Sequence, residues 1–146
     1  MSRFGHAMIA TMIPHTGTMC LLDEVLAWDA MTIRCLSQRF WQSDNPLRHS
    51  GGTLGMACSI ELAAQAMAVH GRLIGADDTP ATRGYLASLR DVSLAAARID
   101  CISGDLFVDA ELLMSDHRSA AYRFEVAAAG HVLASGRATV LLQVDG

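Results

Sequence analysis

The clearest candidate for chemistry is a single carboxyl group within a long apolar stretch of the sequence. Residues 56–70 are rich in Ala, Met, Leu and Ile and contain no Gly or Pro. Before His70, their only strongly polar side chains are Glu61 and Gln65. Four positions apart, these two residues share one face of a helix. A carboxyl group in apolar surroundings is held protonated, so Glu61 could act as a general acid.

The same pattern also allows a purely structural interpretation. Glu61 and Gln65 would then form a narrow solvated stripe on an otherwise buried helix, and Arg72 falls near that stripe. The pattern alone favours neither interpretation over the other.

The segment before this helix is polar and rich in turn residues, so residues 41–55 predict a long loop. His49 lies in it and could accept a proton, although a loop histidine is more often a surface residue. The helix start at Gly55, Met56 and Ala57 exposes backbone amides that could polarise a carbonyl oxygen. His15, after Pro14, is likewise more often a surface residue. The other histidines look like surface or strand-edge residues with no partner in the sequence: His6, His70, His117 and His131.

Periodicity predicts the elements that must position these groups. The composition of residues 56–70 favours helix, with Gly71 or Gly75 suited to its end. Because this helix is apolar nearly all round, it should be buried. A shorter helix is expected at residues 8–13, and strands at residues 19–27, 31–35, 84–92, 106–114, 122–126 and 132–142. We therefore expect one α+β domain, residues 1–146, with a curled antiparallel sheet of five or six strands around one long helix.

Composition limits the classes of function. The net charge is −4 and the eleven cationic residues, all Arg, are scattered, so no nucleic-acid footprint is seen. No stretch is long and apolar enough for a membrane span, and the start of the chain does not fit a signal peptide. The cysteines lack metal-ligand spacing, which makes a zinc site improbable and predicts buried reduced thiols in a cytoplasmic protein: Cys20, Cys35, Cys58 and Cys101.

Two segments resemble the 3-hydroxyacyl-[acyl-carrier-protein] dehydratases of the FabZ/FabA type. Residues 13–25, Ile-Pro-His-Thr-Gly-Thr-Met-Cys-Leu-Leu-Asp-Glu-Val, are similar to that family's opening Leu-Pro-His loop and the apolar strand after it. Residues 60–68, Ile-Glu-Leu-Ala-Ala-Gln-Ala-Met-Ala, resemble its central-helix signature, an acid followed four residues later by Gln. The loop at residues 49–56 lacks the family's Phe-Pro-Gly run and its second Pro-Gly. Asn45-Pro-Leu and Gly52-Thr-Leu, followed by Ile60-Glu-Leu-Ala-Ala-Gln, look closer to a divergent dehydratase-like branch found in aryl-polyene and related fatty-acid-like pathways.

The resemblance implies a hot-dog fold, in which an antiparallel sheet wraps around the long helix and two subunits pair into a homodimer or heterodimer. It implies an acyl chain carried by the phosphopantetheine of an acyl carrier protein, with no cofactor and no metal. Glu61 matches the family's catalytic acid, and His49 is the candidate for its catalytic histidine on the other subunit. Gln65, with Gly55, Met56 and Ala57, would contact the substrate.

Three functions follow from this resemblance and stay open. The main hypothesis is dehydration of 3-hydroxyacyl thioesters to trans-2-enoyl thioesters in a fatty-acid-like or polyene pathway. The first alternative is a hot-dog acyl thioesterase that uses Glu61 as a base. The second is a non-catalytic, acyl-binding subunit of a heterodimer, an alternative that the altered loop supports.

Overall fold

The computed structural model describes residues 3–12, 20–38, 59–75, 82–95, 105–116, 118–128 and 130–144, and for residues 82–86 and 142–144 it describes the backbone alone. Seven strands and two helices lie within these ranges. In chain order they are β1 (Phe4–Gly5), α1 (His6–Met12), β2 (Glu24–Trp28), β3 (Thr32–Ser37), α2 (Ser59–Ile74), β4 (Thr82–Leu94), β5 (Leu106–Ser115), β6 (Ser119–Ala128) and β7 (His131–Val144).

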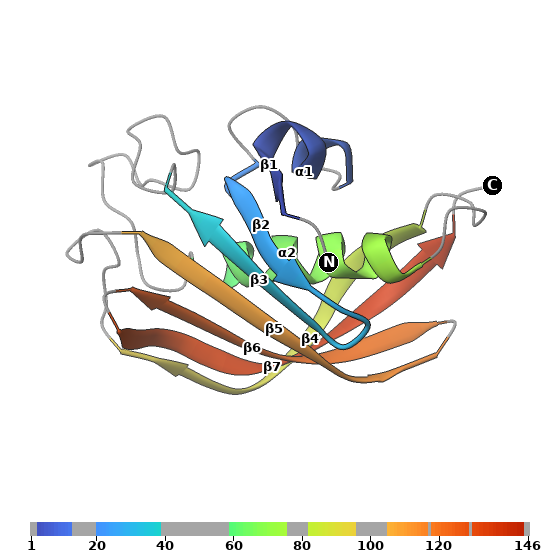
Figure 1. Ribbon diagram of the computed structural model, residues 1–146. Coiled ribbons are helices and arrows are strands. Elements are labelled where there is room, and N and C mark those ends of the chain that lie inside the picture. Colours follow the sequence, from blue (N-terminus) through green and yellow to red (C-terminus); the bar gives the residue numbers. More distant parts are fainter. Residues whose placement is uncertain are drawn as a thin grey trace, which may run out of the picture.

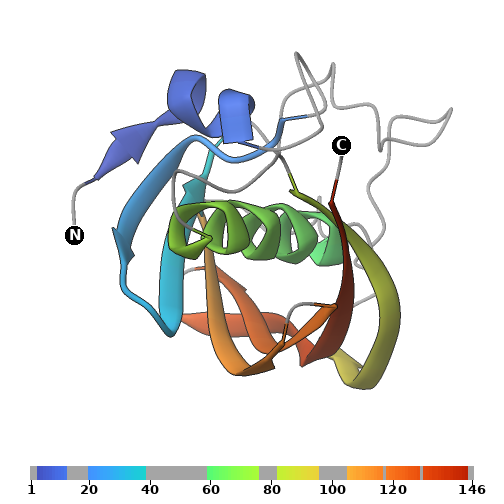
Figure 2. The ribbon, with the colours of Figure 1, turned by 90° about the vertical axis from the view of Figure 1, so that its right-hand side faces the viewer.

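All the strands form one antiparallel sheet that curls around α2. Their order across the sheet is β1-β2-β3-β5-β6-β7-β4. The sheet bends so strongly that α2 lies in its hollow, with β2 and β3 on one side and β7 and β4 on the other (Figures 1 and 2). This confirms the predicted α+β architecture, although the short β1 brings the sheet to seven strands instead of five or six.

The concave face of the sheet is apolar because apolar residues alternate with polar ones along each strand. In β6, Tyr122, Phe124 and Val126 are buried, while Arg123 and Glu125 between them are exposed. Strand β7 continues the same face with the buried small residues Ala134 and Ala138.

Gly136 in β7 shows how tightly this face is packed. A Cβ atom there would lie 3.1 Å from the Phe124 ring and 3.1 Å from a methyl group of Val92. A side chain larger than hydrogen would therefore push the aromatic ring or the strand aside.

Helix α2 is buried, as its composition predicts, and no residue from Ser59 to His70 is exposed. The prediction that Gly71 ends the helix is wrong, since α2 continues to Ile74 before Gly75 follows. At Gly75 a Cβ atom would lie only 2.9 Å from the Gly71 carbonyl oxygen, so a glycine fits this end.

The first predicted strand is also shifted. Residues 20–23 are not part of a strand, and β2 begins only at Glu24. The turn predicted at residues 29–30 is confirmed: the Asp29 carboxylate accepts hydrogen bonds from the amides of Met31 and Thr32, at 2.8 and 2.7 Å. These two bonds lower the pKa of Asp29.

Candidate functional site

Glu61 lies in the first turn of α2 and is half-buried. Its position follows from the local sequence, because the good helix formers around it place the acid on the same face as Gln65. The Oε1 atom of Glu61 accepts a hydrogen bond from Nε2 of Gln65, 3.2 Å away. The carboxyl group is thus held by a neighbour one helical turn further on.

Gln65 itself is buried, with 1% of its surface exposed. Its Oε1 atom accepts a hydrogen bond from the backbone amide of Leu21, at 2.9 Å. The carbonyl oxygen of Leu21 in turn accepts a 2.6 Å bond from the hydroxyl of Ser37, which is fully buried. A chain of polar groups therefore connects β3, the segment before β2 and Glu61. This excludes the solvated stripe as an account of Gln65.

Several of the predicted site residues lie outside the described residues. They are His49, Gly55, Met56 and Ala57, together with residues 13–19 of the first motif. Of the predicted site, the structure brings together Glu61 and Gln65 and adds the Leu21 amide, which sequence reasoning did not identify. Only an indirect feature of the sequence pointed to the Leu21 amide: Leu21 belongs to the first segment that resembles the family, and Gln65 belongs to the second.

His70 corrects a prediction, since it is neither on the surface nor without a partner. It is fully buried at the other end of α2. Its Nε2 lies 2.9 Å from the carbonyl oxygen of Asp29, and its Nδ1 lies 2.7 Å from the hydroxyl of Tyr122. A carbonyl only accepts, so Nε2 carries the proton, and Nδ1 accepts from the tyrosine.

The ionisation of this pair follows from burial. Burial lowers the pKa of His70, partly opposed by its hydrogen bond to Asp29 and by the nearby Asp29 carboxylate. Burial also raises the pKa of Tyr122 to about 12. Both side chains are therefore neutral near pH 7, and both are occupied in tying the helix to β6 and to the β2–β3 turn.

The described cysteines fit the expectation of buried thiols. Cys20 and Cys35 are buried and form no disulfide, and burial raises the pKa of Cys35 to about 12. His6, also predicted to lack a partner, lies 2.8 Å from the Leu22 carbonyl oxygen. Within the described ranges, no three His, Cys, Asp or Glu side chains come together as a metal site. No helix in the same ranges has the length and apolar character to cross a membrane.

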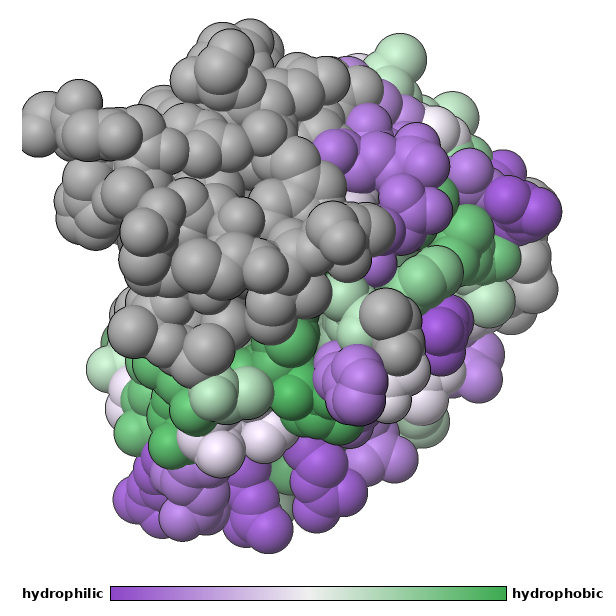
Figure 3. Space-filling model, turned by 90° about the vertical axis from the view of Figure 1, so that its left-hand side faces the viewer, coloured by the Kyte–Doolittle hydropathy of each residue, from purple (hydrophilic) through white to green (hydrophobic). Residues whose placement is uncertain are grey.

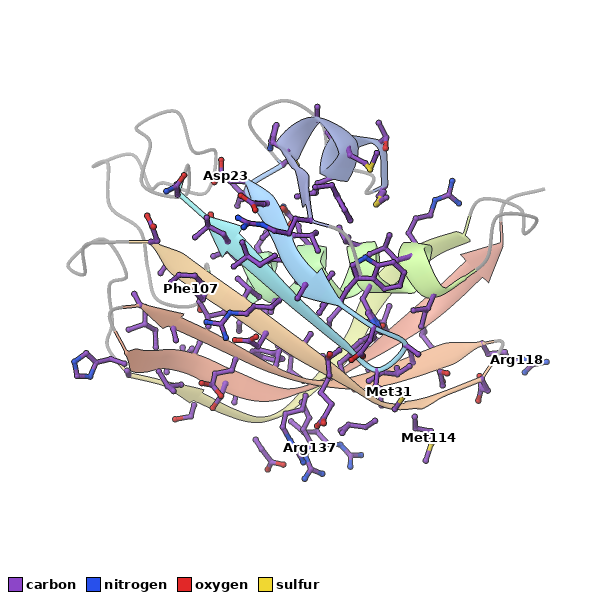
Figure 4. The ribbon with its side chains drawn as sticks, in the orientation of Figure 1. Asp23, Met31, Phe107, Met114, Arg118 and Arg137 are labelled. Atoms are coloured by element: carbon purple, nitrogen blue, oxygen red, sulfur yellow. The ribbon has the colours of Figure 1, made fainter. Side chains whose placement is uncertain are left out.

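The convex face of the sheet, away from α2, carries charged side chains. Arg34 pairs with Asp109 at 3.4 Å and Arg123 with Glu111 at 3.1 Å. Arg137 points away from the helix on this face (Figure 4), and in the sheet it stands opposite both Arg123 and Arg90. These charges lie across the sheet from Glu61, so they do not belong to the candidate site.

Comparison with known proteins decides the family. The model of the ApeP dehydratase family matches residues 7–145, nearly the whole chain. The chain belongs to the ApeP-like dehydratase family. No protein with a curated function matches it in sequence.

Solved structures confirm the fold. The dehydratase heterocomplex ApeI:P from Xenorhabdus doucetiae is 24% identical, with a TM-score of 0.78, over 92% of this chain and 90% of that one. A thioesterase from Haemophilus influenzae, HI1161, is 12% identical, with a TM-score of 0.66, over 97% of this chain and 92% of that one. Zebrafish thioesterase superfamily member 2 is 17% identical, with a TM-score of 0.63, over 94% of this chain and 95% of that one. Family and fold together confirm the resemblance to hot-dog dehydratases and their aryl-polyene branch.

Proposed function

We propose that this ApeP-like dehydratase removes water from 3-hydroxyacyl thioesters carried by an acyl carrier protein in the cytoplasm, as a step of a polyene or fatty-acid-like pathway. Family membership supports the reaction class. The observation that carries the assignment to this site is the half-buried Glu61, held by Gln65 on the helix that the sheet encloses.

The proposed reaction needs one base and one acid. His49, neutral at its ring nitrogen, takes the proton from the α-carbon of the substrate. The amides at Gly55, Met56 and Ala57 hold the thioester carbonyl while negative charge develops on its oxygen. Protonated Glu61 gives its proton to the β-hydroxyl, the carbon–oxygen bond breaks, and water leaves as the trans double bond forms.

The distinction from a thioesterase lies in what Glu61 must do. A thioesterase would use it to direct water at the thioester carbonyl, which requires the ionised carboxylate. The dehydratase requires the protonated acid, and Glu61 is half-buried on the helix that the sheet encloses. The thioesterase neighbours, at 12% and 17% identity, share the fold and carry no argument for hydrolysis here.

The assay that tests this function uses a 3-hydroxyacyl group attached to the phosphopantetheine of a carrier protein. Mass spectrometry of the carrier then reports three outcomes. Loss of one water supports dehydration; release of free acid would instead identify a thioesterase. No change, with or without a second hot-dog subunit, would contradict catalysis. If His49 is the base, His49→Ala abolishes the loss of water, while His131→Ala, at an exposed histidine, preserves it.

We further propose that the site is completed by a related hot-dog subunit, which pairs along β4. Strand β4 pairs with β7 on one side and ends the order of described strands on the other. Three of its apolar side chains are unusually exposed: Leu89 (38%), Val92 (38%) and Leu94 (41%). Leu89 and Leu94 stand opposite the buried Ala138 and Ala134, so both face the hollow of the sheet.

The surface at the end of β4 agrees with such an interface. Figure 3 views the end of the sheet where β4 stops and β7 begins, and it shows hydrophobic surface there, bordered by hydrophilic side chains. A long edge strand with exposed apolar residues favours pairing with a further strand. That the ApeI:P dehydratase forms a heterocomplex supports a partner that is related but different.

Charge introduced at this edge tests the partner. We expect Leu94→Asp to abolish association with a co-expressed hot-dog dehydratase subunit, measured by sedimentation velocity. Met114→Asp is the matched control, because Met114 is 73% exposed and lies at the outer end of β5 (Figure 4). Association that survives Leu94→Asp and is lost with Met114→Asp would place the interface elsewhere.

A further inference from the structure

We propose that a row of three arginines on the convex face of the sheet docks an acidic helix of another protein. The row consists of Arg123 in β6, Arg137 in β7 and Arg90 in β4, and all three are exposed. It lies on the face of the sheet that is turned away from α2 (Figure 4). This inference therefore concerns a surface separate from Glu61 and does not depend on the proposed dehydration.

The first step is that the fold brings together arginines that are far apart in the sequence. Strands β6, β7 and β4 are neighbours in the sheet. Their register places Arg137 opposite Arg123 on one side and opposite Arg90 on the other. Side chains that stand directly opposite each other share one face of the sheet, with Cβ atoms roughly 5 Å apart. The three cationic side chains therefore form a continuous row.

The second step is that the row has too few acids of its own. Arg123 pairs with Glu111 at 3.1 Å. Arg137 and Arg90 form no ion pair with an acid in the described part of the chain, and this includes Asp91, the next residue after Arg90. Cross-strand pairs of like charge destabilise a sheet. The row is thus unfavourable in the isolated fold, and bound carboxylates would relieve the repulsion.

The third step concerns the class of anion. Beside the row on the same face, Asp109 in β5 stands opposite Glu125 in β6, two positions from Arg123. These carboxylates would repel a long phosphate backbone or an anionic membrane laid across the sheet. The net charge of −4 also disfavours a polyanion. A short group of carboxylates, no longer than the row, avoids this repulsion, so we assign the row to a protein partner.

The fourth step is the spacing of the acids. Neighbouring strands lie about 4.8 Å apart, so the two outer arginines of the row are roughly 10 Å apart at their Cα atoms. Along a helix, residues i and i+7 are about 10.5 Å apart on the same face, and residue i+4 lies between them. A helix laid along the row with Glu or Asp at i, i+4 and i+7 would therefore present one carboxylate to each arginine.

A hydrocarbon-stapled helical peptide with Glu at i, i+4 and i+7 tests this surface, and fluorescence anisotropy measures its affinity for the protein. Arg137→Glu should weaken binding by at least about 10-fold, because it sets a carboxylate against the acids of the peptide. The matched control is Arg118→Glu, the same change of charge at an exposed arginine in the turn between β5 and β6, outside the row (Figure 4). It should change the affinity by less than about twofold. No binding, or equal losses in the two variants, would overturn the proposal.

Further probes test the class of partner. A stapled peptide of the same composition, with its three Glu residues on different faces, should bind at least about 10-fold more weakly, because only one carboxylate can then face the row. A DNA duplex and vesicles that contain phosphatidylserine should bind more weakly than the patterned peptide. Equal affinity for the rearranged peptide, or tighter binding of duplex or vesicles that Arg137→Glu abolishes, would exclude an acidic helix as the occupant.

Thermal unfolding separates docking from a structural role of the row. Arg137→Glu places a carboxylate between Arg123 and Arg90, so its melting temperature should equal or exceed that of the wild type. Arg118→Glu should leave the melting temperature unchanged. A clearly lower melting temperature for Arg137→Glu alone would mean that Arg137 stabilises the sheet, and this would contradict the second step of the proposal.

Discussion

The two ends of α2 both carry polar side chains, and they hold them in different ways. At one end, His70 is fully buried and both of its ring nitrogens are bonded, to the Asp29 carbonyl and the Tyr122 hydroxyl. At the other end, Glu61 is only half-buried, and Oε1 is held by Gln65. The histidine cannot exchange a proton without breaking a bond that holds the fold together. A carboxyl oxygen can accept a hydrogen bond in either protonation state, so the bond from Gln65 to Oε1 does not depend on a proton of Glu61.

This contrast separates stability from chemistry on a single helix. His70 connects α2 to β6 and to the β2–β3 turn, so we assign it a structural role. Glu61 is connected through Gln65 to the segment before β2, and we propose that it takes part in the chemistry. Variants at the two ends should accordingly fail in different ways.

The largest effect is expected from removal of the acid. Glu61→Gln keeps the shape of the side chain but has no proton to give, so we expect dehydration to slow by about 10²- to 10⁴-fold. The melting temperature should be close to that of the wild type. Initial rates with a carrier-bound substrate measure the loss. Glu111→Gln, at an exposed carboxylate paired with Arg123, is the control and should retain activity. A fully active Glu61→Gln enzyme would exclude Glu61 as the donor.

At the opposite end, loss of the imidazole should reduce stability. His70→Ala leaves the Asp29 carbonyl and the Tyr122 hydroxyl without their partner and opens a cavity, so we expect the free energy of unfolding to fall by about 2–4 kcal/mol. Denaturant titration measures this change. His131→Ala, at an exposed position, should change it by less than about 0.5 kcal/mol. Equal stabilities for the two variants would mean that the His70 bonds do not stabilise the fold.

The pH dependence of stability should also report on His70. Burial lowers its pKa in the folded state, so below the ordinary value of about 6.5 the unfolded chain binds the proton more readily. The contribution of His70 to the free energy of unfolding is therefore complete above that pH. It is lost as the pH falls, by up to about 1.4 kcal/mol per pH unit. Unfolding curves between pH 7 and pH 5 measure the slope. His70→Gln should have a shallower slope, and an identical one would show that other groups cause it.

The smallest effect is expected from Tyr122→Phe. This change removes the hydroxyl that donates to Nδ1 of His70 and leaves the ring in the core. We expect a loss of about 1–2 kcal/mol in the free energy of unfolding, the cost of one unsatisfied buried group. Dehydration rates should be unchanged. A slower reaction without a loss of stability would mean that the two ends of α2 are coupled.

Much of the fold was predictable because it depends on local patterns. The alternation around Tyr122, Phe124 and Val126 indicated a strand with one buried face, and the apolar composition around Glu61 indicated a buried helix. Strand bounds were less accurate. Residues 20–23 have the composition of a strand, but the Leu21 amide bonds to a side chain of α2 instead of a neighbouring strand.

The candidate site was predictable only in part. The four-residue spacing of Glu61 and Gln65 is a property of the helix, so the sequence predicts that their side chains are neighbours. Leu21, one partner of Gln65, lies 44 positions earlier in the chain, and Asp29 and Tyr122 lie 41 and 52 positions from His70. Nothing in the local pattern around His70 distinguishes a surface histidine from one with both nitrogens bonded.

The sequence by itself thus determined the architecture, the family resemblance and the choice of Glu61, because periodicity and helical spacing act over a few residues. The tertiary structure decided which buried polar groups form hydrogen bonds, and with which partners. Curling the sheet brings Leu21 to Gln65 at one end of α2, and Asp29 and Tyr122 to His70 at the other. Hydrogen bonds between residues so far apart in the chain form only when the core closes, since packing alone sets the distances between them.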